Sequence, residues 1–267
     1  MSFVINPYRF AAAGTGVTLP THWWDLDDDG VWAGQGTKDG DTGWTNGLNE
    51  SGVNTTTSTI GGGGSRTVAN MTDTQYLEFD NSGTKTVAWD GANNDQFSMS
   101  LWLRATALAS SGNWLMSWRG ASASPENRFV QFLVLNSTPD RIYSDVWDSS
   151  GYVGAVSDNT PVDTTWALNK WWHASVTLDA SGNYKLYIGD ENNAPILVDT
   201  LASSYGTIMT EASPFALGTQ SYSKATASGG HAGQMYAAGI WDVALTASEI
   251  TTIWNSGDGG SYSEIWT

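Results

Sequence analysis

The sequence predicts an all-β fold, a sandwich or a barrel, and three observations support that prediction. Short stretches in which apolar and polar residues alternate recur at close intervals from residue 75 onwards, as they do in strands with one buried face. Polar, Gly-rich turns separate these stretches. The chain has 267 residues and no cysteine, so a packed core must hold it without disulfides.

The first 66 residues are the least regular part of the chain. Residues 1–20 are expected to form an extended N-terminal arm, and residues 21–267 a single domain. The stretch THWWDLDDDGVW at 21–32 predicts a short strand that runs into an acidic turn. Residues 33–66 are mainly Gly, Thr, Asn and Ser, which indicates an insert that is either a long loop or a weakly paired hairpin.

Strands follow one another along the rest of the chain. The alternation in FSMSLWLR at 97–104 gives one face the apolar residues Phe97, Met99, Leu101 and Leu103. Residues 171–178 and 183–188 are joined by Asp179-Ala-Ser-Gly182, which predicts a hairpin with a glycine in its turn. The other predicted strands are 75–79, 113–118, 129–135, 141–147, 215–218 and 234–242.

One short helix is predicted near residues 246–255. Thr246 and Glu249 have the spacing of a capping box, in which the first side chain caps the helix and the second reaches back to the cap residue. Ile250, Ile253 and Trp254 then share one helical face. Gly257 is expected to end the helix.

Charge and composition exclude several classes of partner. The formal net charge is −16, from 27 acidic and 11 basic residues. Nucleic acids are held by clustered Lys and Arg, and no such cluster occurs, so we expect no nucleic-acid partner. No run of about 18 apolar residues exists, so no membrane span is expected. Each of the 15 tryptophans is most simply explained as core, although some are candidates for stacking on sugar rings.

Five segments carry a resemblance to a known family. They are HWWDLD (22–27), YLEFD (76–80), FSMSLWL (97–103), WWHASVTLDASGNYKLYIG (171–189) and GQMYAAGIWDVALTASEI (233–250). In this order they resemble the laminin-G-like jelly rolls of the concanavalin-A-like lectin/glucanase group, over about residues 21–257. The resemblance implies a two-sheet antiparallel jelly-roll sandwich, from which the insert 33–66 is a departure.

The resemblance does not imply an activity, because this fold hosts lectins, adhesion modules, virion proteins and glucanases. Retaining glucanases of this fold carry an E-x-D-x-x-E strand that sets two carboxylates about 5 Å apart. The nearest match, Glu78-Phe-Asp80, lacks the second Glu, so we expect a protein that is not an enzyme. His173 stands where the family keeps a buried structural histidine, whereas His22 and His231 are expected in loops or at strand edges.

The acidic turn is a candidate calcium site. Asp25, Asp27 and Asp29 have the D-x-D-x-D-G spacing in which carboxylates converge on an ion and Gly permits a sharp turn. Gly36 stands where an EF-hand has its bidentate Glu. The turn is therefore either a calcium site completed by backbone carbonyls or a solvated acidic turn. The resemblance adds two residues at the position of an Asp-Asn pair in calcium-dependent relatives, Asp80 and Asn81.

Residues 141–148, RIYSDVWD, are the candidate carbohydrate-binding site. Ile142 and Val146 alternate with Tyr143, Asp145 and Trp147. If the aliphatic residues face the core, the other three form an outward strip with aromatic rings for stacking and a carboxylate for hydroxyl groups. The alternative is that Trp147 packs at the sheet edge or beneath a loop. Weaker candidates, expected in loops, are Trp44, Trp118 and Tyr152.

The N-terminal arm bears on where the protein acts. Residues 1–10 resemble the N-termini of phage tail and structural proteins, and they lack the basic start of a secretory signal. We therefore expect a virion protein, capsid decoration or tail-associated, that assembles in the host cytoplasm and exposes a lectin-like domain. The first alternative is a carbohydrate-binding adhesin or secreted lectin module of a bacterium, outside the cell or on its surface. The second is a glycan-degrading enzyme, which would need a carboxylate pair that the sequence does not show.

The arm is also the expected assembly contact. It is apolar and basic, whereas the domain is acidic. It would dock onto other virion proteins or onto a second copy of the chain, and the domain would contact cell-surface glycans. The arm residues expected to make the contact are Phe3, Ile5, Tyr8, Arg9 and Phe10.

Overall fold

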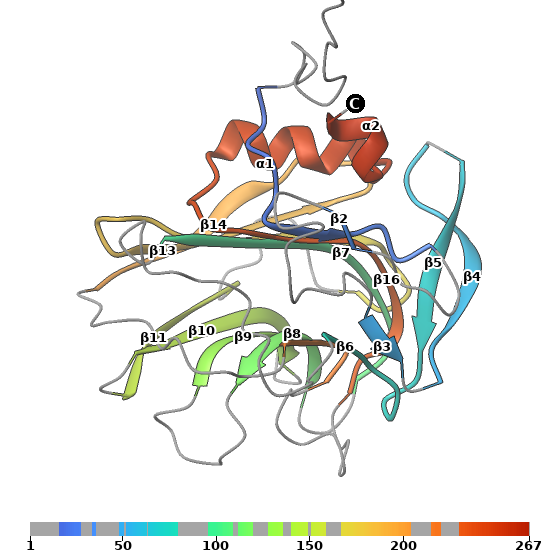
Figure 1. Cartoon of the computed structure of the whole chain (residues 1–267), viewed down its shortest axis with the longest axis horizontal. Coiled ribbons are helices and arrows are strands. Elements are labelled where there is room, and N and C mark those ends of the chain that lie inside the picture. The colour runs from blue at the N-terminus through green and yellow to red at the C-terminus, as the bar shows by residue number, and fades with distance from the viewer. Residues whose placement is uncertain are drawn as a thin grey trace, which may run out of the picture.

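Two antiparallel sheets stacked face to face make up the molecule, and two short helices lie on the outside of one of them (Figure 1). The predicted two-sheet sandwich is therefore confirmed. The structure is a computed structural model and describes residues 16–27, 34–35, 48–50, 52–62, 64–79, 96–108, 112–119, 128–135, 140–148, 151–158, 167–203, 215–219 and 230–266.

Within these residues, nine strands form the larger sheet, which lies directly below the helices in Figure 1. Its main path runs β14-β13-β12-β7-β16-β1-β2, and the hairpin β4–β5 joins it at β16. The strands are β1 (His22–Trp24), β2 (Gly34–Gln35), β4 (Asn54–Thr59), β5 (Ser65–Met71), β7 (Phe97–Ala107), β12 (Trp172–Leu178), β13 (Asn183–Asp190), β14 (Ile196–Ala202) and β16 (Ala232–Trp241).

Seven strands of the described chain form the second sheet, the lower layer in Figure 1. Their order is β11-β10-β9-β8-β15-β6-β3. The strands are β3 (Leu48–Glu50), β6 (Leu77–Phe79), β8 (Asn113–Arg119), β9 (Arg128–Leu135), β10 (Arg141–Asp148), β11 (Gly151–Ser157) and β15 (Phe215–Leu217). The face of this sheet that points away from the nine-stranded sheet is called the outer face below.

The main core fills the space between the sheets. All four apolar residues predicted to share a face of β7 are buried in it, which confirms that alternation. The seven-stranded sheet contributes Phe132 and Val134 from β9. The opposite face of β7 carries Trp102 into a second core, between the nine-stranded sheet and the helices.

The helix α1 (Ala247–Trp254) follows the predicted capping box. The Glu249 backbone donates to Thr246 Oγ1 at 3.2 Å, and the Thr246 backbone donates to Glu249 Oε2 at 2.8 Å. Ile250 and Ile253 are buried in the second core. α1 ends at Trp254, because Asn255 caps it in the left-handed conformation, with φ of 52°. A 3₁₀ turn (Asn255–Gly257) follows, so the helical segment stops at Gly257, as predicted.

The predictions did not include the strands β2, β3, β11 and β14 or the helix α2 (Tyr262–Trp266). For residues 54–66 the hairpin alternative is confirmed, since β4 and β5 pair in register from Asn54↔Asn70 to Thr59↔Ser65. The expected loop or strand-edge position holds for His231, whereas His22 lies inside the sheet. His22 is buried within β1, between β16 and β2, and His231 is fully buried just before β16.

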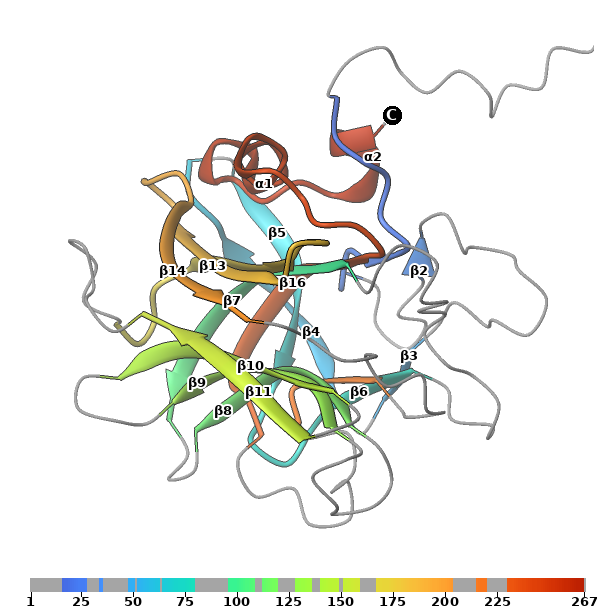
Figure 2. The same ribbon diagram turned by 90° about the vertical axis from the view of Figure 1, so that its left-hand side faces the viewer.

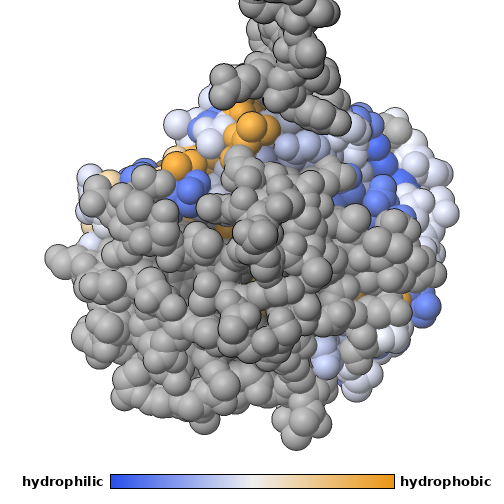
Figure 3. All heavy atoms as spheres, in the orientation of Figure 1, coloured by the Kyte–Doolittle hydropathy of each residue, from blue (hydrophilic) through white to orange (hydrophobic). Residues whose placement is uncertain are grey.

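The described start of the chain crosses the helix-covered side of the molecule (Figure 2). Thr18 donates through its backbone and its hydroxyl to Glu249 Oε1, and its carbonyl accepts from Trp241 Nε1. The predicted assembly residues of the arm lie outside the described residues. In the view of Figure 3 the described surface is largely hydrophilic, with apolar residues gathered toward the helices. None of the described helices is long and apolar enough to cross a membrane.

Candidate functional site

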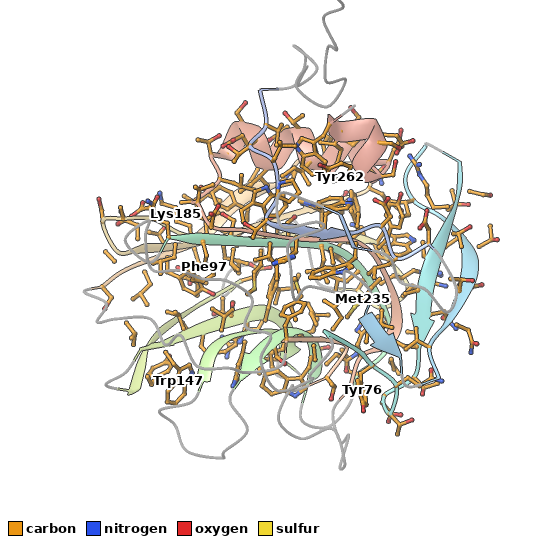
Figure 4. All side chains as sticks on the ribbon, viewed as in Figure 1. Tyr76, Phe97, Trp147, Lys185, Met235 and Tyr262 are labelled. Carbon is orange, nitrogen blue, oxygen red and sulfur yellow. The ribbon has the colours of Figure 1, made fainter. Side chains whose placement is uncertain are left out.

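The strip Tyr143, Asp145 and Trp147 lies on the outer face. Ile142 and Val146 are buried in the main core, so the residues that alternate with them point the other way. Figure 4 shows Trp147 on the side of β10 that is remote from the nine-stranded sheet. The orientation on which the carbohydrate prediction depended is therefore present, and binding itself stays a prediction.

A β-bulge brings a second aromatic residue to this strip. The pairing of β10 with β11 shifts after Val146↔Gly154, so that Trp147 lies opposite Tyr152. Val153 is the extra residue, and it packs against the main core. Tyr152 is thereby turned onto the outer face, where its ring meets Trp147 edge-on, with centroids 5.2 Å apart at 66°.

Exposure differs sharply along this site. Tyr152 is 54% exposed, which makes it the most accessible large side chain there. Tyr143 and Trp147 are half-buried, and Asp145 is 7% exposed. The aromatic pair therefore consists of an outward ring, Tyr152, that is braced from the side by Trp147.

Tyr143 is a permanent hydrogen-bond donor in the strip. Burial raises the pKa of its hydroxyl, and the nearby Asp145 carboxylate raises that pKa further. The hydroxyl donates to Asp145 Oδ2 at 3.4 Å. Deprotonation of Tyr143 is therefore excluded at physiological pH.

Polar side chains of the neighbouring strands form the base of the site. Gln131 of β9 pairs in register with Asp145 on one side and with Ser117 of β8 on the other. Ser117 is fully buried and donates to the Thr219 carbonyl at 2.8 Å. Gln131 is 3% exposed, and its Nε2 has no hydrogen-bond partner within the described structure. No sequence pattern pointed to Gln131, because its place beside Asp145 depends on strand register.

The three weaker aromatic candidates differ in where the structure places them. Tyr152, expected in a loop, is instead in β11. Trp118 is in β8, but its side chain lies outside the described residues, as does all of Trp44.

In the acidic turn, Asp25 has a structural role. Its Oδ1 accepts from Trp23 Nε1 at 2.6 Å and from the Tyr262 backbone at 2.7 Å. Burial raises the pKa of Asp25, although these hydrogen bonds oppose that rise. One carboxylate oxygen is thus used to fasten α2 to β1.

Calcium binding stays a prediction. No cluster of three or more His, Cys, Asp or Glu that could hold a metal occurs among the described residues. Asp29, Asp80 and Asn81 lie outside those residues, so only Asp25 and Asp27 of the predicted ligands are placed.

His173 is buried and not available for catalysis. Its Nε2 lies 2.9 Å from Ser100 Oγ, and Ser175 donates to the same oxygen at 2.8 Å. Burial lowers the pKa of His173 to about 3 and that of His231 to about 4, so both rings are neutral. The structural role expected for His173 agrees with this placement.

Comparisons with solved structures agree with the fold. Domain 4 of AbnA, a GH43 extracellular arabinanase of Geobacillus stearothermophilus solved with arabinotriose, is 15% identical, with a TM-score of 0.55 over 88% of this chain and 97% of that one. The CBM40 domain of the Ruminococcus gnavus IT-sialidase, bound to α2,3-sialyllactose, is 13% identical, with a TM-score of 0.51 over 70% and 95%. The botulinum neurotoxin D ligand-binding domain with N-acetylneuraminic acid is 14% identical, with a TM-score of 0.52 over 88% and 50%.

These identities are too low to transfer a ligand, and what they show is the fold. A search of the curated proteins finds no match. The family model described as the concanavalin A-like lectin/glucanases superfamily matches residues 70–251, which is more than half of the chain. With the two-sheet sandwich and its strand order, this match shows that the chain belongs to the concanavalin A-like lectin/glucanase superfamily.

Proposed function

We propose that the domain binds carbohydrate without cleaving it, at the outer face around Tyr152 and Trp147. The observation that carries the proposal is the bulge that turns Tyr152 outward and braces it against Trp147 above buried polar groups. The solved relatives, which are mostly carbohydrate-binding domains, support the same class of function.

The chemistry of the site suits a sugar. A pyranose or furanose ring has an apolar C–H face, which packs on an exposed aromatic ring, and hydroxyl groups at its rim, which need hydrogen bonds. Tyr152 offers the exposed ring. Asp145 offers acceptor oxygens and Tyr143 a hydroxyl that stays protonated.

Cleavage is not part of the proposal, because the sequence lacks the carboxylate-pair strand of the family's retaining glucanases. Glu78-Phe-Asp80 is not followed by a Glu at the required spacing. The fold accommodates both kinds of protein, so this residue-level difference is what separates them.

A glycan array probed with the intact protein and two variants tests the proposal. Tyr152→Ala should lower binding at least tenfold, because it removes the exposed stacking ring. Ile196→Ala is the matched control: it removes an apolar side chain of similar exposure, 47%, from β14 of the other sheet. Equal binding by Tyr152→Ala and the intact protein, or no binding to any glycan, would contradict the proposal.

For the place of action we propose a virion, where the arm anchors the protein and the outer face contacts host glycans. The orientation of the chain supports this arrangement. Residues 16–18 run over the helix-covered side, whereas the strip is on the far side of the sandwich (Figure 2). An anchor that precedes residue 16 would therefore leave the strip pointing outward.

Removal of residues 1–15 tests the anchoring. The shortened protein should fold and bind glycan like the intact chain but fail to co-purify with virions. Incorporation into particles without these residues would argue against the arm. A protein found on bacterial cells and never in particles would favour the alternative, a bacterial adhesin.

A further inference from the structure

The site around Tyr152 contains a buried amide that nothing in the fold explains. Gln131 points to the outer face, because its neighbours Val130 and Phe132 are both in the main core. It is 3% exposed, yet its Nε2 makes no hydrogen bond within the described structure. Buried amide N–H groups are normally paired, so this one indicates a missing acceptor.

The cross-strand neighbour of Gln131 is an acceptor of the opposite kind. Asp145 is its register partner, and such partners have Cβ atoms about 5 Å apart. An ionised carboxylate only accepts hydrogen bonds, whereas an amide NH₂ only donates. A hydroxyl group does both at once, so it can accept from Gln131 while it donates to Asp145.

We propose that the site binds an uncharged sugar and holds one of its hydroxyl groups between Gln131 and Asp145. This inference rests on the proposed function and names the ligand class for it. Tyr152 packs against the C–H face of the sugar. Gln131 donates a hydrogen bond to one sugar hydroxyl, and the same hydroxyl donates to the Asp145 carboxylate.

The described carboxylate at the base of the site, Asp145, disfavours an acidic sugar. Asp145 would face a sugar carboxylate with a like charge, and the whole chain carries a net charge of −16. Arg141 is the cation of the described part of β10, but it is six residues from Trp147, about 20 Å along the strand. It is therefore too distant to neutralise a carboxylate on a sugar stacked against Tyr152.

The first test uses pairs of oligosaccharides that differ by one terminal sialic acid, titrated with the intact protein. Uncharged members should bind at least tenfold more tightly than their sialylated partners in 0.15 M salt. Tighter binding of the sialylated members would overturn this inference and leave carbohydrate binding intact. Binding of neither member in any pair would overturn the proposed function together with the inference.

The second test separates a ligand contact from a structural role. Gln131→Met keeps the shape of the side chain and removes the amide, so affinity for the uncharged sugar should fall at least tenfold while the melting temperature stays equal or rises. Gln131→Asn, which withdraws the amide by one methylene, should weaken binding as well. Ile196→Ala again serves as the control. Unchanged affinity in both Gln131 variants, with only the melting temperature altered, would overturn the inference.

Discussion

Two buried histidine residues make the stability of the folded protein sensitive to acid. His173 and His231 have pKa values of about 3 and about 4 in the folded state, below the ordinary value of 6.5, because burial disfavours their charged forms. A depressed folded pKa means that the unfolded state binds protons first. The stability that each neutral ring contributes is fully present above pH 6.5. It is lost as the pH falls toward the pKa of that ring in the folded state.

We therefore predict that unfolding free energy falls by about 1.4 kcal/mol per pH unit for each buried histidine, between pH 6 and 4.5. His173→Gln should flatten this slope by one histidine's share, whatever its effect on absolute stability. Asp179 and Asp190 leave this window unaffected, because their pKa values are lowered below 3.8 by hydrogen bonds that outweigh the opposing effect of burial. Urea denaturation at several pH values measures the slope, and an unchanged slope would refute the assignment.

At this scale, residue identity alone predicted little about the site. The outward direction of Tyr143, Asp145 and Trp147 was predictable, since alternation in a strand is a local property. Tyr152 and Gln131 were not, because their positions depend on a bulge and on strand register, which arise from other parts of the chain. The burial of His22 and His231 likewise depends on segments that cover them.

Among elements, the C-terminal helix α2 shows how the second core is closed. Trp266 packs edge-on against Trp23, with ring centroids 4.8 Å apart, and Arg66 of β5 pairs with Glu264 at 2.8 Å. Asp25 holds the start of the helix through the Tyr262 backbone. The helix is thus joined to both β1 and β5.

Substitutions of Asp25 test this connection. Asp25→Ala leaves two buried donors without their acceptor and should cost about 2 kcal/mol of unfolding free energy. Asp25→Asn keeps an acceptor oxygen and removes a desolvated charge near Asp27 and Glu264, so its stability at pH 7 should equal or exceed that of the native chain. The raised pKa of Asp25 leads to the same expectation for Asp25→Asn. The protonated form of Asp25 stabilises the folded state, and this stabilisation is lost as the pH rises through the pKa of the folded state.

Chemical denaturation of Asp25→Ala and Asp25→Asn at pH 7 measures the unfolding free energy of each variant. A large loss in Asp25→Asn would mean that the charge itself stabilises the fold, contrary to the burial argument.

Strong local patterns were the predictable elements. The alternating strands, the β12–β13 hairpin and the capping box of α1 each depend on neighbouring residues, and all are present. β14 was not predicted because this edge strand exposes Ile196 and Leu197 and lacks a clean alternation. The five-residue helix α2 is too short for a helical period, and tertiary contacts hold it in place.

For the whole molecule, calcium binding at the acidic turn is still a prediction. We predict that calcium raises the melting temperature relative to excess chelator, if Asp27 and Asp29 converge on an ion. Magnesium at equal concentration is the control for a non-specific effect of charge on an acidic protein. Equal melting temperatures in calcium and in chelator would exclude the site.

The sandwich presents two unlike sides. One is covered by the helices and by residues 16–21, and the other is the outer face with its aromatic pair. The family and the sandwich follow from sequence patterns spread over the chain, whereas the ligand site depends on how β9, β10 and β11 are aligned. We therefore propose a location for sugar binding, namely the outer face of these three strands.

Amide hydrogen exchange, with and without the uncharged oligosaccharide that binds most tightly on the array, tests that location most directly. We predict slower exchange in the bound protein across residues 141–157, which span β10 and β11, and no change in the β4–β5 hairpin or in α1. Protection confined to the helix-covered side, with exchange in β10 and β11 unaltered, would contradict the account.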